Sequence, residues 1–243
     1  MAWIAGFLLS LAVLTTCKAF PQPLVKICVN TSCRKANSLQ TYQLFEDICP
    51  SNCKVETSGC LGRCGEGPNV SVSHEEGDEG AVYNGVVKAT KAAAILELEG
   101  LTVKDSVVAA YSTKMLGDKA AKMGKASDAV ASYNQALQCD LASSPRTQSS
   151  VLLGKGLALI KMQQRQTNKE LLVEAEKTLR LALQAWEGNL RAWTALADAL
   201  EAEGRGDEAA ATLDEAIAAV TALGDSEAVG QLTSKRQKLE DRI

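Results

Sequence analysis

Two alanines framing a larger apolar residue recur three times in the second half of this 243-residue chain. The pattern, Ala-x3-Tyr/Leu-x2-Ala, occupies residues 129–136, 175–182 and 209–216. Its three apolar positions fall on one face of an α-helix, and the small residues let a neighbouring helix approach closely. The last two copies are 34 residues apart, which is a period of stacked helix pairs. The first two are 46 apart, and we place the excess of twelve residues in the loops around 143–149 and 163–168. This recurrence predicts an all-helical repeat array.

The recurring pattern resembles the second helix of a tetratricopeptide repeat (TPR). Residues 116–120, 154–159 and 193–200 fit the first helix of each repeat, and Asp225–Ile243 fits the polar helix that caps such arrays. The resemblance implies an all-α TPR solenoid with a capping helix over residues 105–243. It also implies a concave groove that binds a protein partner, through a peptide or a helix, within a larger complex.

Six of the eight cysteines lie between residues 28 and 64. Cys28 and Cys33 follow a short β-rich run, and Cys60 and Cys64 lie in the glycine-rich stretch 60–69. Glycines permit turns that direct several backbone N–H groups toward one point. Four thiolates in two loops are the number that a tetrahedral metal ion or an iron–sulfur cluster requires.

The elements expected around these cysteines follow the order strand, helix, strand, strand, strand, helix. We place the strands near residues 24–29, 54–57, 69–73 and 80–84, and the helices near 38–49 and 88–99. The four cysteines then follow the first and second strands of this order.

This segment resembles the thioredoxin-like 2Fe-2S ferredoxins, and its spacing is similar to that of the 2Fe-2S subunit of NADH dehydrogenases. The resemblance is carried by Ile27–Arg34, Gly59–Gly65, Gly67–Val70 and Tyr83–Val86. It implies a 2Fe-2S cluster bound by Cys28, Cys33, Cys60 and Cys64. Backbone N–H groups of Gly62, Arg63 and Gly65 would offset the negative charge of the cluster and its thiolates.

Other interpretations of the cysteines remain open from the sequence. A zinc ion could take the same four thiolates, although structural zinc sites commonly use two-residue spacings. Cys49 and Cys53 lie outside the family pattern and could form a regulatory disulfide, replace a ligand, or stay idle at a helix end. A secreted thiol–disulfide oxidoreductase would instead have disulfides among residues 28–64, but the chain lacks a C-x2-C motif.

The first residues indicate targeting. Met1–Thr16 is an uncharged apolar run typical of a secretory signal, and Lys18–Pro21 resembles the cleavage motif of plastid presequences in algae with secondary plastids. We therefore expect a plastid location, in the stroma or at the stromal face of the thylakoid, with the secretory pathway or a membrane anchor as alternatives. The sequons at Asn30 and Asn69 lie beside the cysteine loops, so we interpret them as chance matches.

Composition changes near residue 100, from Gly, Cys and Asn before it to Ala, Leu and Glu after it. We expect an α+β chain of two domains. Its parts are a signal or targeting segment (1–23), a thioredoxin-like 2Fe-2S ferredoxin domain (24–100), a linker (101–104) and a TPR-like helical repeat domain (105–243).

The net charge of −3 gives no basic surface for nucleic acid, and the single histidine argues against histidine-based catalysis. The chain also lacks a Walker loop and a Ser-His-Asp set. We therefore expect an electron carrier or binding protein more than an enzyme. The leading hypothesis is a 2Fe-2S electron-transfer or redox-sensing protein docked to a plastid complex through its TPR domain. The alternative is a TPR scaffold or assembly factor whose cluster domain is structural or vestigial.

Overall fold

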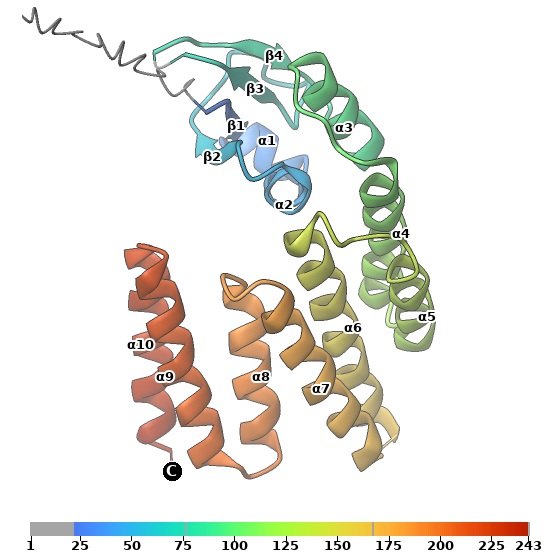
Figure 1. Ribbon diagram of the computed structural model, residues 1–243, viewed down its shortest axis with the longest axis vertical. Coiled ribbons are helices and arrows are strands. Elements are labelled where there is room, and N and C mark those ends of the chain that lie inside the picture. Colours follow the sequence, from blue (N-terminus) through green and yellow to red (C-terminus); the bar gives the residue numbers. More distant parts are fainter. Residues whose placement is uncertain (1–21, 76, 167, 243) are drawn as a thin grey trace, which may run out of the picture.

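The computed structural model describes residues 22–75, 77–166 and 168–242. Figure 1 shows a small sheet with three helices, followed by helices that stack side by side along a curved array. The expected targeting segment lies almost entirely outside the described residues. Within the described part, no helix is both long and apolar enough to cross a membrane.

The sheet has four strands in the order β2-β1-β3-β4. The strands are β1 (Leu24–Cys28), β2 (Lys54–Ser58), β3 (Val70–Ser73) and β4 (Ala81–Tyr83). β1 pairs in parallel with β2 and antiparallel with β3, which pairs antiparallel with β4. Because Cys28 lies opposite Ser58 in the parallel pair, the loops that leave β1 and β2 start from the same edge of the sheet.

Three helices accompany the sheet: α1 (Thr31–Lys35), α2 (Ser38–Ile48) and α3 (Ala89–Leu98). The sequence pattern predicted α2, α3 and all four strands to within about two residues, but it assigned Cys33 to a turn. In the structure Cys33 is the buried residue of α1. The side-chain oxygen of Asn30 accepts from the Thr31 N–H at 2.6 Å, which starts this short helix directly after β1.

The second half consists of seven helices in the described residues. They are α4 (Asp105–Lys122), α5 (Ala126–Ala136), α6 (Pro145–Gln166), α7 (Lys169–Ala185), α8 (Leu190–Ala202), α9 (Gly206–Ala222) and α10 (Ser226–Glu240). Consecutive helices pack against one another, and α10 covers α9 at the end of the array (Figure 1). The array is TPR-like, and α10 is the expected capping helix.

The alanine-framed pattern lies where the sequence placed it, on the buried faces of α5, α7 and α9. Its large residues, Tyr133, Leu179 and Leu213, are at most 2% exposed. The ring of Tyr133 fits between α4 and α6 because both helices carry a glycine there. A Cβ added to Gly117 or Gly154 would lie 2.8 or 2.6 Å from that ring.

The α+β unit and the helical array share one continuous hydrophobic core, which runs from Val25 in β1 to Ala158 in α6. Leu101, in the expected linker, is buried in it. The end of α2 docks on the start of α6: the Asp47 carbonyl accepts from Thr147 Oγ1, and its carboxylate from Ser150 Oγ, both at 2.6 Å. This contact fixes α2 beside the array.

Candidate functional site

Two places gather chemically useful side chains: the cysteine loops beside the sheet, and a pocket between α2 and the helical array. The cysteine loops leave the common edge of β1 and β2. Cys28 and Cys33 are buried, whereas Cys60 and Cys64 are exposed in the glycine-rich loop, with their sulfurs 3.4 Å apart. The predicted ligands therefore come as one buried pair and one exposed pair.

The two cysteine pairs influence each other electrostatically. The pKa of the Cys33 thiol is raised by its burial, by its hydrogen bond to Cys28 and by the charges of Cys28 and Cys64. The pKa of Cys64 is raised mainly by its contact with Cys60, and Cys28 adds to this effect. Electrostatic contacts thus connect sulfurs of both loops.

Backbone N–H groups reach two of these sulfurs. The Gly62 amide lowers the pKa of Cys60, and the Asn69 amide opposes the rise in the pKa of Cys33. The sequence analysis missed Asn69 as a donor, although it lies at the end of the same glycine-rich loop. Among the described residues, neither Arg63 nor Gly65 contributes in this way to the pKa of Cys33, Cys60 or Cys64. The Arg63 carbonyl instead accepts from Asn69 Nδ2 at 2.7 Å.

The backbone approaches Cys33 closely from Gly67. A Cβ at Gly67 would lie 2.8 Å from Cys33 Sγ, so this position accepts no larger residue without a shift. Asn69 is 1% exposed, which leaves no room for a glycan at its sequon in this fold.

The donor set fits a 2Fe-2S cluster in chemistry: four cysteine sulfurs, arranged as two pairs with N–H donors to one sulfur of each pair. The described residues contain no group of three or more His, Cys, Asp or Glu side chains that converge tightly enough to hold a single metal ion. Cluster binding therefore stays a prediction. The other pair, Cys49 and Cys53, lies between the two loops in sequence and is buried after the end of α2, with its sulfurs 3.4 Å apart.

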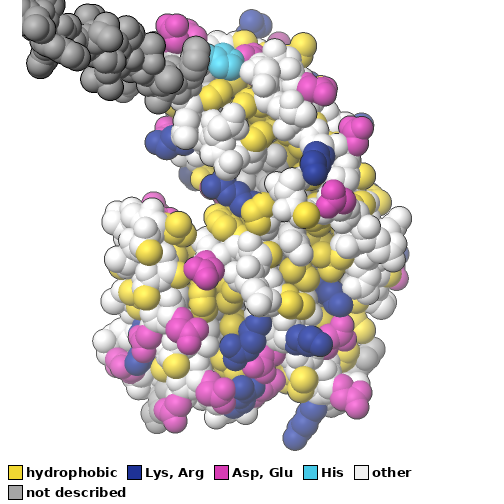
Figure 2. All heavy atoms as spheres, in the orientation of Figure 1, with side chains coloured by type: hydrophobic (Ala, Val, Ile, Leu, Met, Phe, Trp, Pro, Cys, Tyr) yellow, Lys and Arg dark blue, Asp and Glu magenta, His cyan; other side chains and the backbone are white. Residues whose placement is uncertain are grey.

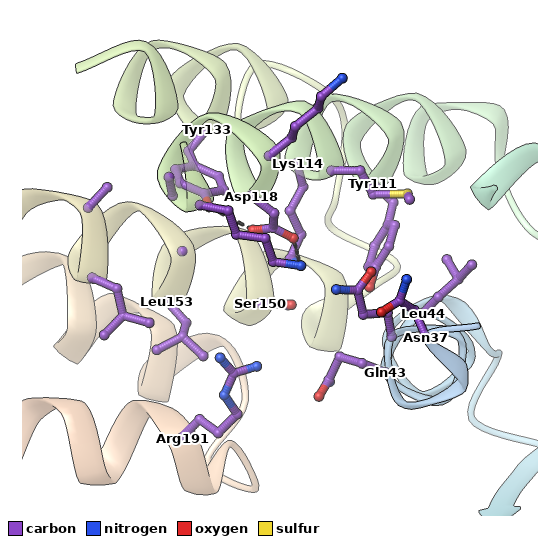
Figure 3. Close-up of a pocket in the computed structure, with 18 of the residues that line it drawn as sticks. Asn37, Gln43, Leu44, Tyr111, Lys114, Asp118, Tyr133, Ser150, Leu153 and Arg191 are labelled. Carbon is purple, nitrogen blue, oxygen red and sulfur yellow. Dashed lines mark hydrogen bonds and ion pairs between the residues drawn. The ribbon is translucent and has the colours of Figure 1, made fainter. Parts of the chain in front are cut away.

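The pocket has a volume of about 740 Å³ and lies between α2 and the first helices of the array. We call it the groove pocket. In Figure 3 Gln43 and Leu44 of α2 face residues of α4, α6 and α8 across it. Its size falls within the range of about 300–1,000 Å³ that is typical of ligand sites.

A connected polar group forms one wall of the groove pocket. Asp118 accepts from Lys114 Nζ at 3.0 Å and from the Tyr133 hydroxyl at 2.6 Å (Figure 3). Lys114, only 7% exposed, also lies over the ring of Tyr111, 4.8 Å from its centroid. Burial and the Asp118 carboxylate raise the pKa of Tyr133, so its hydroxyl stays protonated and keeps donating at physiological pH.

Four further cations line the groove pocket: Lys119, Lys122, Lys161 and Arg191. All four are exposed, and none forms an ion pair with a carboxylate of the described residues. The opposite wall, from α2 and the segment before α3, has no charged side chain; it consists of Asn37, Leu39, Gln40, Thr41, Gln43, Leu44 and Val87. The sequence analysis predicted a groove but none of these residues, because α2 was assigned to a separate domain.

No family model matches the chain, and no curated protein matches its sequence. Solved TPR structures are similar to part of it. The first TPR of Spaghetti (RPAP3), bound to an HSP90 peptide, has 19% identity over 54% of this chain and 95% of its own, with a TM-score of 0.41. The Arabidopsis OM64 TPR domain has 19% identity over 55% and 98%, with a TM-score of 0.42.

A third similar structure is the TPR2AB domain of yeast Sti1 in its complex with pHSP90. It has 18% identity over 54% of this chain and 46% of its own, with a TM-score of 0.44. At TM-scores below 0.5, the description of the second half as TPR-like rests on its own helix packing.

Proposed function

We propose that this protein is an interaction protein that holds a segment of a partner protein in the groove pocket. One observation carries the proposal: a pocket of about 740 Å³ opens between α2 and the helices α4, α6 and α8, which alternate along the array with the pattern-bearing helices. Its wall is preformed by the hydrogen bonds among Lys114, Asp118 and Tyr133. This function corresponds to the scaffold or assembly role inferred as an alternative from the sequence.

A peptide-display selection against the full chain tests this proposal. Ala121, on α4, lines the pocket, and Ala131, on the exposed side of α5, does not. Ala121→Trp should fill the pocket and abolish binding of most selected peptides, whereas the matched Ala131→Trp should leave binding unchanged. Peptides that bind both variants equally well, or a selection that yields none, would contradict binding in the groove pocket.

We propose a second function at the cysteine loops: binding of a 2Fe-2S cluster for electron transfer or redox sensing. The specific support is the parallel pairing of β1 with β2, which starts both cysteine loops from one edge of the sheet. Cys28, Cys33, Cys60 and Cys64 would hold the cluster, which supplies one-electron chemistry when bound. The Gly62 and Asn69 amides would stabilise negative charge on the sulfurs.

The visible absorption spectrum of the reconstituted protein tests the second function. The bands of a 2Fe-2S cluster should appear and should be lost in Cys60→Ser. Cys139→Ser is the matched control, because Cys139 lies at the end of the first helix pair and outside both cysteine loops. A colourless protein that carries zinc would overturn this proposal. A plastid complex as the partner rests on the presequence pattern alone.

A further inference from the structure

We infer that the groove pocket is a composite docking site for an acidic segment of a partner protein, bound between the cations of the helical array and the uncharged wall of α2, which exposes Leu39. This inference rests on the proposed function and adds two things to it: the chemistry of the partner, and the α+β unit as half of the site.

The groove pocket is lined mainly by positive charge, although the chain as a whole is negative. The whole chain carries −3, yet five cations line this one cavity. Asp118 neutralises Lys114 at 3.0 Å, and the remaining four cations have no carboxylate partner in the part of the chain that the structure describes. Several unpaired cations around a concavity focus a positive potential and attract acidic groups.

The opposite wall is uncharged, and its apolar side chains Leu39 and Val87 are open to solvent. Leu39 is 55% exposed and Val87 is 49% exposed, and both line the pocket. When a ligand covers large apolar side chains that are exposed beside a pocket, the burial of their surface favours binding. The occupant should therefore present acidic residues to the array and at least one large apolar residue to α2.

The α2 wall is held in place. The Asp47 backbone and carboxylate accept from Thr147 and Ser150 of α6, and Gln43 donates to the Asp47 carboxylate at 3.0 Å. A ligand therefore meets two walls that are already fixed relative to each other, which lowers the entropy cost of binding. Figure 2 shows the surface hollowed between the α+β unit and the last helices of the array, so the concave side is open to a partner.

A protein segment suits this site better than a nucleic acid. The cations are confined to one pocket, and a chain with a net charge of −3 would repel an extended polyanion outside it. The exposed leucine and valine of the other wall match an apolar side chain of a peptide and offer no contact to a phosphate.

Fluorescence anisotropy with the full chain provides the test. The probe is a labelled synthetic peptide of glutamates around a central leucine, with two matched peptides that carry glutamine for glutamate or serine for leucine. The glutamate–leucine peptide should bind about tenfold tighter than the glutamine peptide, and its affinity should fall as salt is raised. The serine peptide should also bind more weakly.

Two pairs of variants locate the contact. Lys161→Glu should weaken binding of the glutamate–leucine peptide about fivefold, whereas Lys169→Glu, an equal charge change at the exposed start of α7, should have no effect. Leu39→Ser should weaken binding, whereas Leu98→Ser, at a 77% exposed leucine of α3, should not. Circular dichroism of each variant checks that the fold is kept.

The outcomes separate the inference from the proposed function. Equal binding of the glutamate and glutamine peptides, or equal effects within either variant pair, overturns the composite acidic site. Displacement of the peptide by single-stranded DNA at equal concentration does the same. If display selection still yields peptides that Ala121→Trp rejects, the proposed function survives and only its acidic chemistry is wrong; if selection yields none, the proposed function itself fails.

Discussion

The contact between α2 and α6 centres on one buried carboxylate, and its removal should cost the protein a large part of its stability. Asp47 is 1% exposed, and its carboxylate accepts from Ser150 Oγ at 2.6 Å and from Gln43 Nε2 at 3.0 Å. Asp47→Ala leaves the buried Ser150 hydroxyl without this acceptor and opens a small cavity. An orphaned buried donor costs about 1–3 kcal/mol, and the cavity about 1 kcal/mol.

We therefore expect Asp47→Ala to lower the free energy of unfolding by about 2–4 kcal/mol. The bond from Thr147 to the Asp47 carbonyl is retained in this variant, so the loss reports on the side chain alone. Urea unfolding followed by circular dichroism at neutral pH measures it, as a lower midpoint at unchanged slope. Asp78→Ala, at an exposed turn, should stay within about 0.5 kcal/mol of the natural protein.

A double-mutant cycle of Asp47→Ala with Ser150→Ala should give a coupling energy of about 1 kcal/mol or more, because the two groups share one hydrogen bond. If Asp47→Ala lowered the free energy of unfolding by less than about 1 kcal/mol, a change comparable with that of Asp78→Ala, the docking of α2 on α6 through Asp47 would be refuted.

Two further predictions concern pH and packing. Burial raises the pKa of Asp47 above its usual 3.8, so the folded state binds this proton more tightly than the unfolded state does. As pH rises from 3.8 through the folded-state pKa, the free energy of unfolding of the natural protein should fall relative to that of Asp47→Asn, which does not titrate. Below and above this window, the difference in free energy between the two proteins should stay constant. A difference that is constant at every pH would contradict the raised pKa. Gly154→Ala should lower stability by about 1–3 kcal/mol because its Cβ meets a buried tyrosine ring at 2.6 Å. The matched Gly230→Ala, with no atom within 4 Å in α10, should raise stability by up to about 1 kcal/mol in the same urea assay.

The helical half and the positions of the strands along the chain could be predicted because their signals are local and periodic. The alanine-framed pattern specifies a helix face from eight consecutive residues, and all its members are buried as expected. The four strands lie within about two residues of the short β-rich runs that predicted them. In both cases the physical cause lies in neighbouring residues, which a single sequence shows.

The groove pocket could not be predicted, because its walls come from residues far apart in the chain. Leu39 and Arg191 line the same cavity, and no local pattern relates them. Asp47 would be expected at the surface of an isolated domain, since a carboxylate is seldom fully buried without partners. Its partners Thr147 and Ser150 lie on a helix that the sequence assigned to a different domain.

The two candidate sites can be separated by experiment, and their separation decides between the functions inferred from the sequence. Cys60 lies in an exposed loop, and no cysteine lines the groove pocket. Cys60→Ser should therefore abolish the visible absorption of the reconstituted protein while peptide affinity, measured by anisotropy, stays within about twofold. This result would favour electron transfer or redox sensing, because the cluster would then be dispensable for docking. A parallel loss of absorption and affinity would instead show that the cluster supports the α+β wall of the groove pocket, as expected for a scaffold in which it is structural.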